Sequence, residues 1–217
     1  MTDFAHARRL MVDNQLRTSA ITDRRVLRAM GEVPREKFVP AVRQGLAYID
    51  EAQPLHATRR LSAPAPFAKM VQLAAIEHTD HVLDVGCGMG YSAAVLGRLA
   101  ASVVAAEDDT MLAGAARKVL AETGASNVTI VDGALDSAGK GQGPYDVIVV
   151  EGTVAEVPMA LLGQLKPDGR LVASIGGAGK VPVAHLFAKS GQNIASRADF
   201  DARLPPLMAV RDDSFVF

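Results

Sequence analysis

The stretch "HVLDVGCGMGY", residues 81–91, decides the fold of this chain. A short apolar run carries an acid, Asp84, near its end, and glycines follow at alternate positions, Gly86, Gly88 and Gly90. Glycines in a turn let the backbone approach a ligand closely, and the last one lets a helix start close against the strand. The stretch therefore predicts a strand, a ligand-binding turn and a helix, in that order.

Strand-like and helix-like segments alternate in the rest of the chain. Runs rich in Val, Ile and Leu at 102–107, 127–133, 145–152 and 169–176 show little polar alternation, which is typical of strands covered on both faces. The more alternating tail, around "NIASRADFDARLPPLMAV", predicts two further edge strands. We expect an α/β fold, a Rossmann-like, doubly wound, mostly parallel seven-stranded sheet with an N-terminal helical lobe.

The first sixty residues predict helices and no obvious strand. Thr22 is expected to cap a helix over "DRRVLRAM", and the prolines of "VPREKFVP" break the next segment. Residues 46–66 form a long irregular connection, of the kind that often carries a site. We expect a single domain over 1–217, with 1–62 as the lobe and substrate loop and 63–217 as the cofactor-binding core.

Composition limits the class of protein. The chain has 217 residues, 49% hydrophobic and 22% charged, with a formal net charge of −1, as in ordinary globular proteins. The balanced charge argues against a nucleic-acid partner held by phosphate contacts. One cysteine allows no internal disulfide and no paired-cysteine metal site. Without a leader or an apolar run that could span a bilayer, we expect a cytoplasmic protein with no metal and no membrane partner.

Glu107 and the glycine spacing narrow the ligand. Glu107 ends the next strand about 20 residues after the first glycine, the offset of a carboxylate that binds ribose hydroxyls. The spacing is GxGxG, whereas nicotinamide dinucleotide sites use GxGxxG, and no Lys-Ser/Thr pair closes a phosphate-binding loop. Asp84, two residues before the first glycine, suits a ligand with an ammonium group better than a pyrophosphate.

The acid-x-Gly-x-Gly-x-Gly arrangement resembles the first motif of class I methyltransferases that use S-adenosylmethionine. By that resemblance the glycine turn faces the methionine part of the cofactor and Glu107 binds its ribose. The implied cofactor-binding residues are Asp84, Gly86, Cys87, Gly88, Glu107, Asp132, Gly133 and Ala134, the last three beside the adenine. Cys87 is interpreted as a small loop residue, because no neighbouring histidine is evident that would make it a nucleophile.

The flanking segments resemble protein-L-isoaspartate O-methyltransferases. They are "MVDNQLRTSAITDRRVLRAMGEVPREKFVP", "LAYIDEAQPL", "LSAP" and, near the end, "ARLPPL", so the resemblance covers nearly the whole chain. The family methylates the carboxylate of isoaspartyl residues, which implies isoaspartyl peptides or proteins as partners. For the oligomeric state we expect a monomer or weak dimer. The resemblance also implies Ser62 as the catalytic serine, although the same residue could simply cap the helix that enters at Pro64.

The loop before Ser62 departs from the family pattern, roughly Gly-x-Gly-x-Thr-Ile-Ser-x-Pro. Here "HATRRLSAP" places His56, Thr58 and Arg60 at the two glycines and the threonine, and Glu151 stands where the family has small residues or threonine. His56, Arg59 and Arg60 are the predicted substrate-binding residues, since paired arginines can bind an anion in bidentate fashion. Two alternatives stay open: a methyltransferase with another, anionic acceptor, or a cofactor-binding regulator without turnover.

Overall fold

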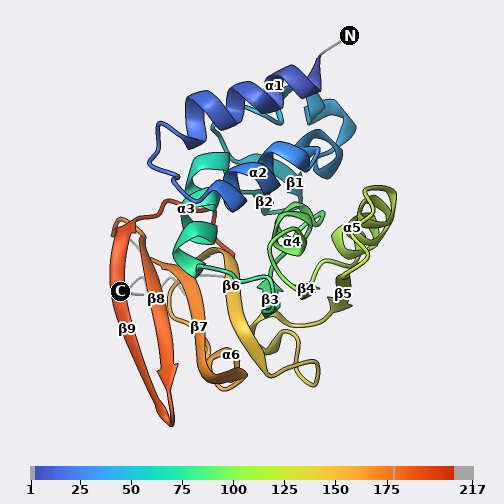
Figure 1. Cartoon of the computed structure of the whole chain (residues 1–217). Helices are drawn as coiled ribbons and strands as arrows, with labels where there is room; N and C mark the ends of the chain where they lie inside the picture. The colour runs from blue at the N-terminus through green and yellow to red at the C-terminus, as the bar shows by residue number, and fades with distance from the viewer. Residues whose placement is uncertain (1–2, 178, 208–217) are drawn as a thin grey trace, which may run out of the picture.

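The computed structural model describes residues 3–177 and 179–207. Its main sheet has seven strands in the order β5-β4-β3-β6-β7-β8-β9 (Figure 1). The first five are parallel, and β8 and β9 extend the sheet in antiparallel fashion. The predicted fold class is therefore confirmed. The strands are β3 (His81–Val85), β4 (Ser102–Glu107), β5 (Val128–Asp132), β6 (Tyr145–Val154), β7 (Leu165–Ile175), β8 (Val183–Ser190) and β9 (Asn193–Asp201).

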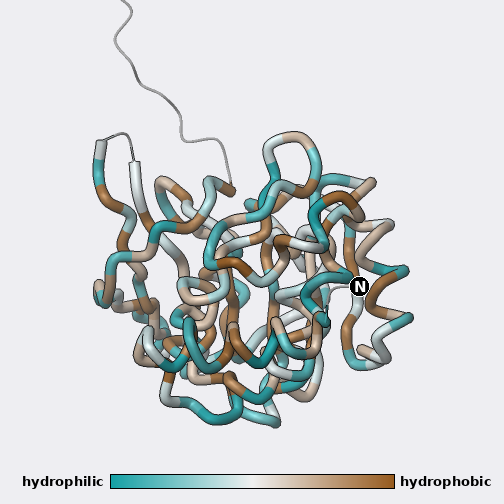
Figure 2. Tube along the Cα trace, turned by 90° about the horizontal axis from the view of Figure 1, so that it is seen from above, coloured by the Kyte–Doolittle hydropathy of each residue, from teal (hydrophilic) through white to brown (hydrophobic). Residues whose placement is uncertain are grey.

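Both faces of the central strands β3, β4 and β6 are buried, because successive side chains enter two different cores, whereas the edge strand β5 is only partly buried. Val82 packs into the core that includes residues of α3 (Pro64–Ala74), α4 (Tyr91–Gly97) and α5 (Thr110–Glu122). Leu83, its neighbour, packs into the core on the opposite face, with α6 (Met159–Leu162). In Figure 2 many hydrophobic segments of the chain lie toward the middle of the molecule, while much of the chain at its periphery is hydrophilic. This two-sided burial explains why the strands lack polar alternation.

The N-terminal lobe consists of α1 (Phe4–Met11), a π-helical turn (Val12–Leu16), α2 (Arg24–Glu32) and two 3-10 turns (Arg35–Phe38 and Ala41–Leu46). In Figure 1, α1 lies at the top of the molecule, above α3. Asp23, one residue after the expected Thr22, is the N-cap of α2 and accepts a hydrogen bond from the Arg25 backbone N–H. The helical lobe is as predicted, with its cap shifted by one residue.

The expectation of no strand in the first sixty residues is wrong. β1 (Gln53–His56) and β2 (Arg59–Leu61) form an antiparallel hairpin separate from the main sheet. The two strands have only four and three residues, the register shifts between Pro54 and His56, and Ala57 has a positive φ of 46°. Strands this short and irregular leave no periodic pattern in the sequence.

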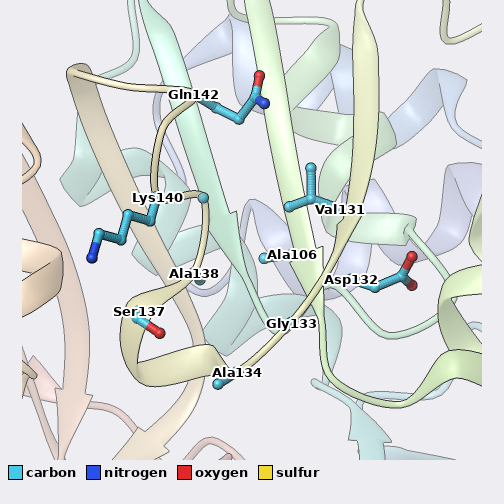
Figure 3. A pocket seen from close by; sticks show the side chains of 10 residues that line it. Ala106, Val131, Asp132, Gly133, Ala134, Ser137, Ala138, Lys140 and Gln142 are labelled. Carbon is cyan, nitrogen blue, oxygen red and sulfur yellow. The ribbon is translucent and has the colours of Figure 1, made fainter.

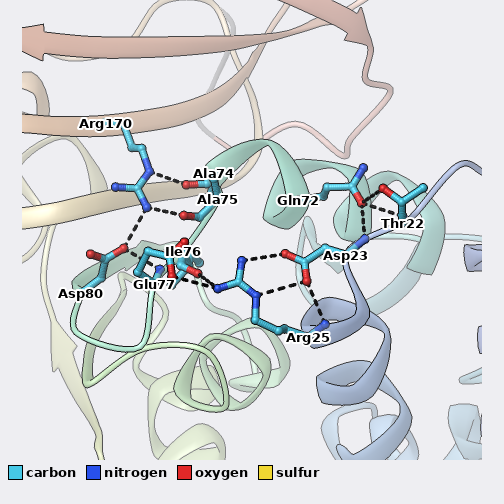
Figure 4. A network of polar contacts seen from close by, with 10 residues as sticks. All are labelled: Thr22, Asp23, Arg25, Gln72, Ala74, Ala75, Ile76, Glu77, Asp80 and Arg170. Carbon is cyan, nitrogen blue, oxygen red and sulfur yellow. Dashed lines mark hydrogen bonds and ion pairs between the residues drawn. The ribbon is translucent and has the colours of Figure 1, made fainter.

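Polar contacts at the C-terminal end of α3 join the lobe to the sheet (Figure 4). The Gln72 side chain accepts hydrogen bonds from the backbone N–H groups of Thr22 and Asp23, at 2.8 and 2.9 Å. Arg170 of β7 donates to the carbonyls of Ala74 and Ala75 and pairs with Asp80 at 2.8 Å. These contacts fix the helix that follows the β1–β2 hairpin.

Candidate active site

Three predicted cofactor residues meet at one edge of the sheet, because the strands that carry them are parallel neighbours. Asp84 lies at the carboxyl end of β3, Glu107 ends β4 and Asp132 ends β5. Glu107 and Asp132 are register partners, and the Gly133 N–H donates to the Glu107 carbonyl at 3.2 Å. Ligands of open α/β sheets bind beyond this edge.

The glycine turn folds around the Glu107 carboxylate. Gly86, Gly88 and Gly90 have φ angles of 86°, 57° and 91°, a region that side chains disfavour. The Gly86 N–H donates to the Ala106 carbonyl of β4 at 2.8 Å, and the Gly88 N–H donates to Glu107 Oε2 at 2.6 Å. The turn thus exposes bare backbone on one side and fixes the predicted ribose ligand on the other.

Glu107 is completely buried and already has several donors. Besides Gly88, the backbone N–H groups of Asp108 and Asp109 donate to Oε1, both at 3.2 Å, and Arg59 Nη2 donates to Oε2 at 2.7 Å. Burial raises the pKa of the Glu107 carboxyl above its usual value, and the Arg59 guanidinium opposes that shift. Arg59 therefore pairs with the acid that we expected to bind the ribose.

Asp84 is a buried acid with one free oxygen. Its Oδ2 accepts a hydrogen bond from Ser92 Oγ at 2.7 Å, whereas Oδ1 has no partner among the residues that the structure describes. Burial raises the pKa of this carboxyl to about 7, the Ser92 hydrogen bond opposes the shift, and the Glu107 charge adds to it. A buried oxygen without a donor is rare in native proteins, and it suits a cationic or hydrogen-bonding ligand.

Cys87 and Ser62 are both buried, with different consequences. Burial raises the pKa of the Cys87 thiol well above its usual value, so the thiol stays protonated and a poor nucleophile. Ser62 is 3% exposed, and its hydroxyl has no hydrogen-bond partner within residues 3–177 and 179–207. Ala63 occupies the N-cap position of α3, without a side-chain capping bond, so the reading of Ser62 as a helix cap is not supported. Its hydroxyl is free for another contact.

Arg35 holds the Ser62 backbone, a role that the sequence did not reveal. Its fully buried guanidinium donates to the Ser62 carbonyl at 2.6 Å and to the Ala47 carbonyl at 2.7 Å. It also lies 4.8 Å from the ring centre of Tyr91, the first residue of α4. Arg35 thereby connects the glycine turn's helix to the Ser62 loop. The sequence signal was a charged segment between two prolines, which predicted a turn or a short helix and no partner for Arg35.

The predicted substrate-binding residues diverge along the hairpin. Arg59 points inward to Glu107, while the neighbouring Arg60 is exposed and donates to the Ala52 carbonyl at 2.8 Å. His56 Nδ1 lies 2.5 Å from Asp109 Oδ2 at the rim of the site, and its side chain is 53% exposed. The two arginines therefore do not form one anion-binding pair.

Two cavities lie along this edge. One, of only about 10 Å³, is lined by Leu55, Arg60, Leu61, Ser62, Gly86, Cys87, Gly88, Ser92 and Glu151. The other, of about 230 Å³, borders Asp132, Gly133 and Ala134, the predicted adenine segment (Figure 3). The Asp132 carboxylate is directed away from Ser137 and Lys140 on the far side of that cavity and pairs with Arg117 at 2.5 Å.

The residues at this edge fit S-adenosylmethionine in their chemistry. Asp84 Oδ1 can accept a hydrogen bond from a cationic group, and Glu107 can accept hydrogen bonds from ribose hydroxyls. The glycine turn has no side chains that would keep a ligand away from its backbone. The space above the turn is filled by the chain itself. A Cβ added at Gly86 would lie 2.4 Å from a methyl of Leu207 and 2.9 Å from Arg59 Nη2. Leu207 and Arg59 therefore occupy the space that the sequence analysis assigns to the cofactor.

Among residues 3–177 and 179–207, no group of three or more His, Cys, Asp or Glu side chains is arranged to hold a metal ion. Over the same described residues, no helix is both long enough and apolar enough to cross a bilayer.

Comparison with known proteins agrees with this geometry. The chain is 38% identical over 208 residues to a protein-L-isoaspartate O-methyltransferase of Koribacter versatilis (strain Ellin345), covering 96% of this chain and 93% of the relative. It is 40% identical to protein-L-isoaspartate O-methyltransferase 2 of Anaeromyxobacter sp. (strain Fw109-5), covering 85% of this chain and 76% of the relative.

Solved structures show the same fold. A protein-L-isoaspartate O-methyltransferase superposes with a TM-score of 0.81 at 26% identity, covering 93% of this chain and 66% of that longer one. A second, from Plasmodium falciparum, has a TM-score of 0.80 at 20% identity, over 93% of this chain and 98% of that one. That structure contains S-adenosyl-L-homocysteine.

Residues 6–209 match the sequence profile of protein-L-isoaspartate(D-aspartate) O-methyltransferase. The match spans nearly the whole chain and confirms the resemblance inferred from the glycine turn, the "LSAP" segment and the lobe. The expected activity class and cofactor are confirmed at the level of the family. This chain belongs to the protein-L-isoaspartate(D-aspartate) O-methyltransferase family.

Proposed function

We propose that this chain transfers a methyl group from S-adenosylmethionine to the carboxylate of isoaspartyl residues in peptides and proteins. The observation that carries the proposal is the buried, unpartnered hydroxyl of Ser62, which lines the same small cavity as Gly86 and Gly88. An acceptor bound beside Ser62 would lie next to the glycine turn. Family membership supports the same activity.

The reaction depends on the positioning of the acceptor carboxylate more than on proton transfer. When bound, S-adenosylmethionine supplies a methyl group on a cationic sulfur, which an ionised carboxylate can accept without a strong general base. The chain has to remove water from that carboxylate, hold it in line and close the crevice. In this proposal Ser62 Oγ donates a hydrogen bond to the acceptor, and the β1–β2 hairpin covers it.

Glu151 is compatible with a carboxylate acceptor. It lines the same small cavity as Ser62. Burial, and next the Asp84 charge, raise the pKa of the Glu151 carboxyl well above its usual value. A raised pKa favours the protonated form of the acid, which carries no charge to repel the acceptor and can donate a hydrogen bond. The departure from the family's small residue is thereby compatible with the proposed substrate.

In this proposal residues 1–62 supply the acceptor side and residues 63–217 the cofactor side of one methyltransferase domain, acting as a monomer or weak dimer. The alternative of an anionic acceptor bound by Arg59 and Arg60 has less support, because the two guanidinium groups have different partners.

The test uses a radiolabelled methyl donor with an isoaspartyl peptide and its normal-aspartyl twin. We expect base-labile label on the isoaspartyl peptide alone, since a methyl ester hydrolyses in base. Label on both peptides, or on neither while S-adenosylhomocysteine binds in calorimetry, would rule out the proposed acceptor.

Ser62→Ala is the sharpest variant for this assay. Losing one hydrogen bond to a charged acceptor should lower kcat/KM for the isoaspartyl peptide about tenfold. Binding of S-adenosylhomocysteine should stay within about twofold, because the hydroxyl is assigned to the acceptor. The matched control is Ser102→Ala, at the opposite end of the strands, where the hydroxyl contacts His81 at 2.7 Å. Equal losses in both variants would remove Ser62 from the acceptor site.

A further inference from the structure

Three side chains of the chain cover the glycine turn, where the cofactor is expected. Leu207 and Arg59 lie over Gly86, and a Leu55 methyl would lie 2.7 Å from a Cβ at Gly88. The remaining cavity beside the turn, about 10 Å³, is barely enough for a single water molecule. The glycines remove side chains from the turn, and residues from elsewhere in the chain fill the space.

Arg59 differs from the two leucines because it pairs with Glu107, the residue that we expect to bind the ribose of the cofactor. Its guanidinium donates to Glu107 Oε2 at 2.7 Å, and the two side chains are 11% and 0% exposed. Glu107 Oε1 already accepts two backbone N–H groups, so Oε2 is the oxygen that Arg59 shares with Gly88. A ribose hydroxyl that approaches this carboxylate has to compete with a charged hydrogen bond.

We propose that Arg59 is an internal ligand of the cofactor site: its guanidinium occupies the ribose-binding carboxylate of Glu107 and has to leave when the cofactor enters. Arg59 is therefore a residue that sets cofactor affinity. The inference rests on the cofactor of the proposed function and is independent of the methyl acceptor.

The charges around the site support such an exchange. Asp84, Glu107 and Glu151 lie close enough to Arg59 for its charge to lower the pKa of each carboxyl, against the larger raising effect of burial. Arg59 is the cation that partly neutralises this acidic group. S-adenosylmethionine brings its own cationic sulfur and an ammonium group, so one cation replaces another and the buried acids keep a counter-charge.

The hairpin that carries Arg59 can move without disturbing the main sheet. It is a two-stranded sheet of its own, and such isolated hairpins have little intrinsic stability. Two of the contacts that fix it over the site are Arg59 with Glu107 and the half-exposed His56 with Asp109. Release of Arg59 breaks the buried one of these two contacts.

The test measures binding of S-adenosylhomocysteine to the full chain by titration calorimetry, without any acceptor. When the binding-competent state is a minority, the apparent dissociation constant rises by the inverse of its fraction. Arg59→Ala should therefore bind at least about tenfold more tightly than the unmodified protein if the open site is populated at about a tenth or less. Arg59→Met removes the charge and keeps the bulk, so it should give part of the gain.

Arg28→Ala is the control, because this exposed arginine lies on α2, outside the residues that line the cavity beside the glycine turn, and pairs with Glu32 at 2.8 Å. Its affinity should stay within about twofold of the unmodified protein. Thermal melting checks that each variant folds, and Arg59→Met replaces Arg59→Ala if the latter does not.

Unchanged or weaker binding in the Arg59 variants would overturn the inference, as would the absence of binding in the unmodified protein and both variants. Binding that appears only in the variants would support it. A failed isoaspartyl assay together with tighter binding in Arg59→Ala would refute the proposed acceptor and leave the inference standing.

Discussion

The acidic side chains at the two ends of the parallel strands differ in their hydrogen-bond partners and in the direction of their pKa shifts. At the amino end, Asp146 accepts hydrogen bonds from the His81 N–H and from Lys166 Nζ, both at 2.7 Å. Partial burial pushes the pKa of this carboxyl up, but these hydrogen bonds and the Lys166 charge outweigh it, and the pKa lies below its usual value. Asp80 similarly pairs with Arg170 and accepts the Glu77 N–H.

At the carboxyl end, burial dominates. The pKa values of Asp84, Glu107 and Glu151 are all raised, and one oxygen of Asp84 has no partner. The same strand, β3, therefore begins beside a satisfied acid and ends with an unsatisfied one. Acids at the amino end stabilise the fold, whereas those at the carboxyl end reduce its stability and remain available to a ligand.

The largest loss of stability is expected at the amino end, from Arg170→Ala. The change leaves Asp80 without its cation and two carbonyls at the end of α3 without a donor. Because the ion pair is partly exposed, we expect the free energy of unfolding to fall by about 2–3 kcal/mol, less than for a fully buried pair. Urea unfolding measures it, and binding of S-adenosylhomocysteine should stay within about twofold.

The control for this prediction is Arg197→Ala on β9, where an exposed arginine pairs with Asp199. Its loss should be below about 0.5 kcal/mol. If Arg170→Ala weakened cofactor binding but left unfolding unchanged, the division of roles between the two ends would be wrong.

Asp84→Asn tests the carboxyl end through its pH dependence. The folded pKa, about 7, lies above the unfolded value of 3.8, so the folded protein binds more protons between these limits and loses stability as pH rises. The shift corresponds to at most about 4 kcal/mol. We expect Asp84→Asn to match the unmodified protein near pH 4 and to be about 1–4 kcal/mol more stable at pH 8, measured by urea unfolding.

Asp146→Asn is the control of opposite sign. Its folded pKa is lowered, so its contribution is present above its usual pKa and is lost as pH falls through the folded value. Asp146→Asn should therefore lose stability at pH 8 and little near pH 3. Parallel pH profiles in the two asparagine variants would contradict the comparison of the two ends.

The sheet and the acids at its carboxyl end could be predicted because their signals are local. Buried parallel strands are continuous apolar runs, and the offset from the glycines to Glu107 spans one strand–helix–strand unit. Asp84, Glu107 and Asp132 meet because parallel strands end at a common edge. None of this requires knowledge of distant contacts.

The roles of Arg35 and Arg59 could not be predicted because they depend on partners far along the chain. Arg35 binds carbonyls 12 and 27 residues away, and Arg59 binds an acid 48 residues away. The paired arginines 59 and 60 looked alike in the sequence, yet a strand directs neighbouring side chains to opposite faces. That alternation was invisible because the strand has three residues.

The smallest effect on the free energy of unfolding is expected for the pair of His56 with Asp109 at the rim of the site. Asp109 resembles the acids at the amino end, because its hydrogen bonds lower its pKa. Asp109 also caps α5, accepting the backbone N–H groups of Met111 and Leu112, and the His56 hydrogen bond is the main cause that lowers its pKa. Its contribution is therefore present above its usual pKa and lost as pH falls through the folded value. Since His56 is half-exposed, His56→Gln should change the free energy of unfolding at pH 7 by less than about 0.5 kcal/mol. Asp109→Ala, which also removes the cap, should lose about 1 kcal/mol. A loss in His56→Gln as large as that in Asp109→Ala would mean that the pair, and not the cap, accounts for most of the contribution of Asp109.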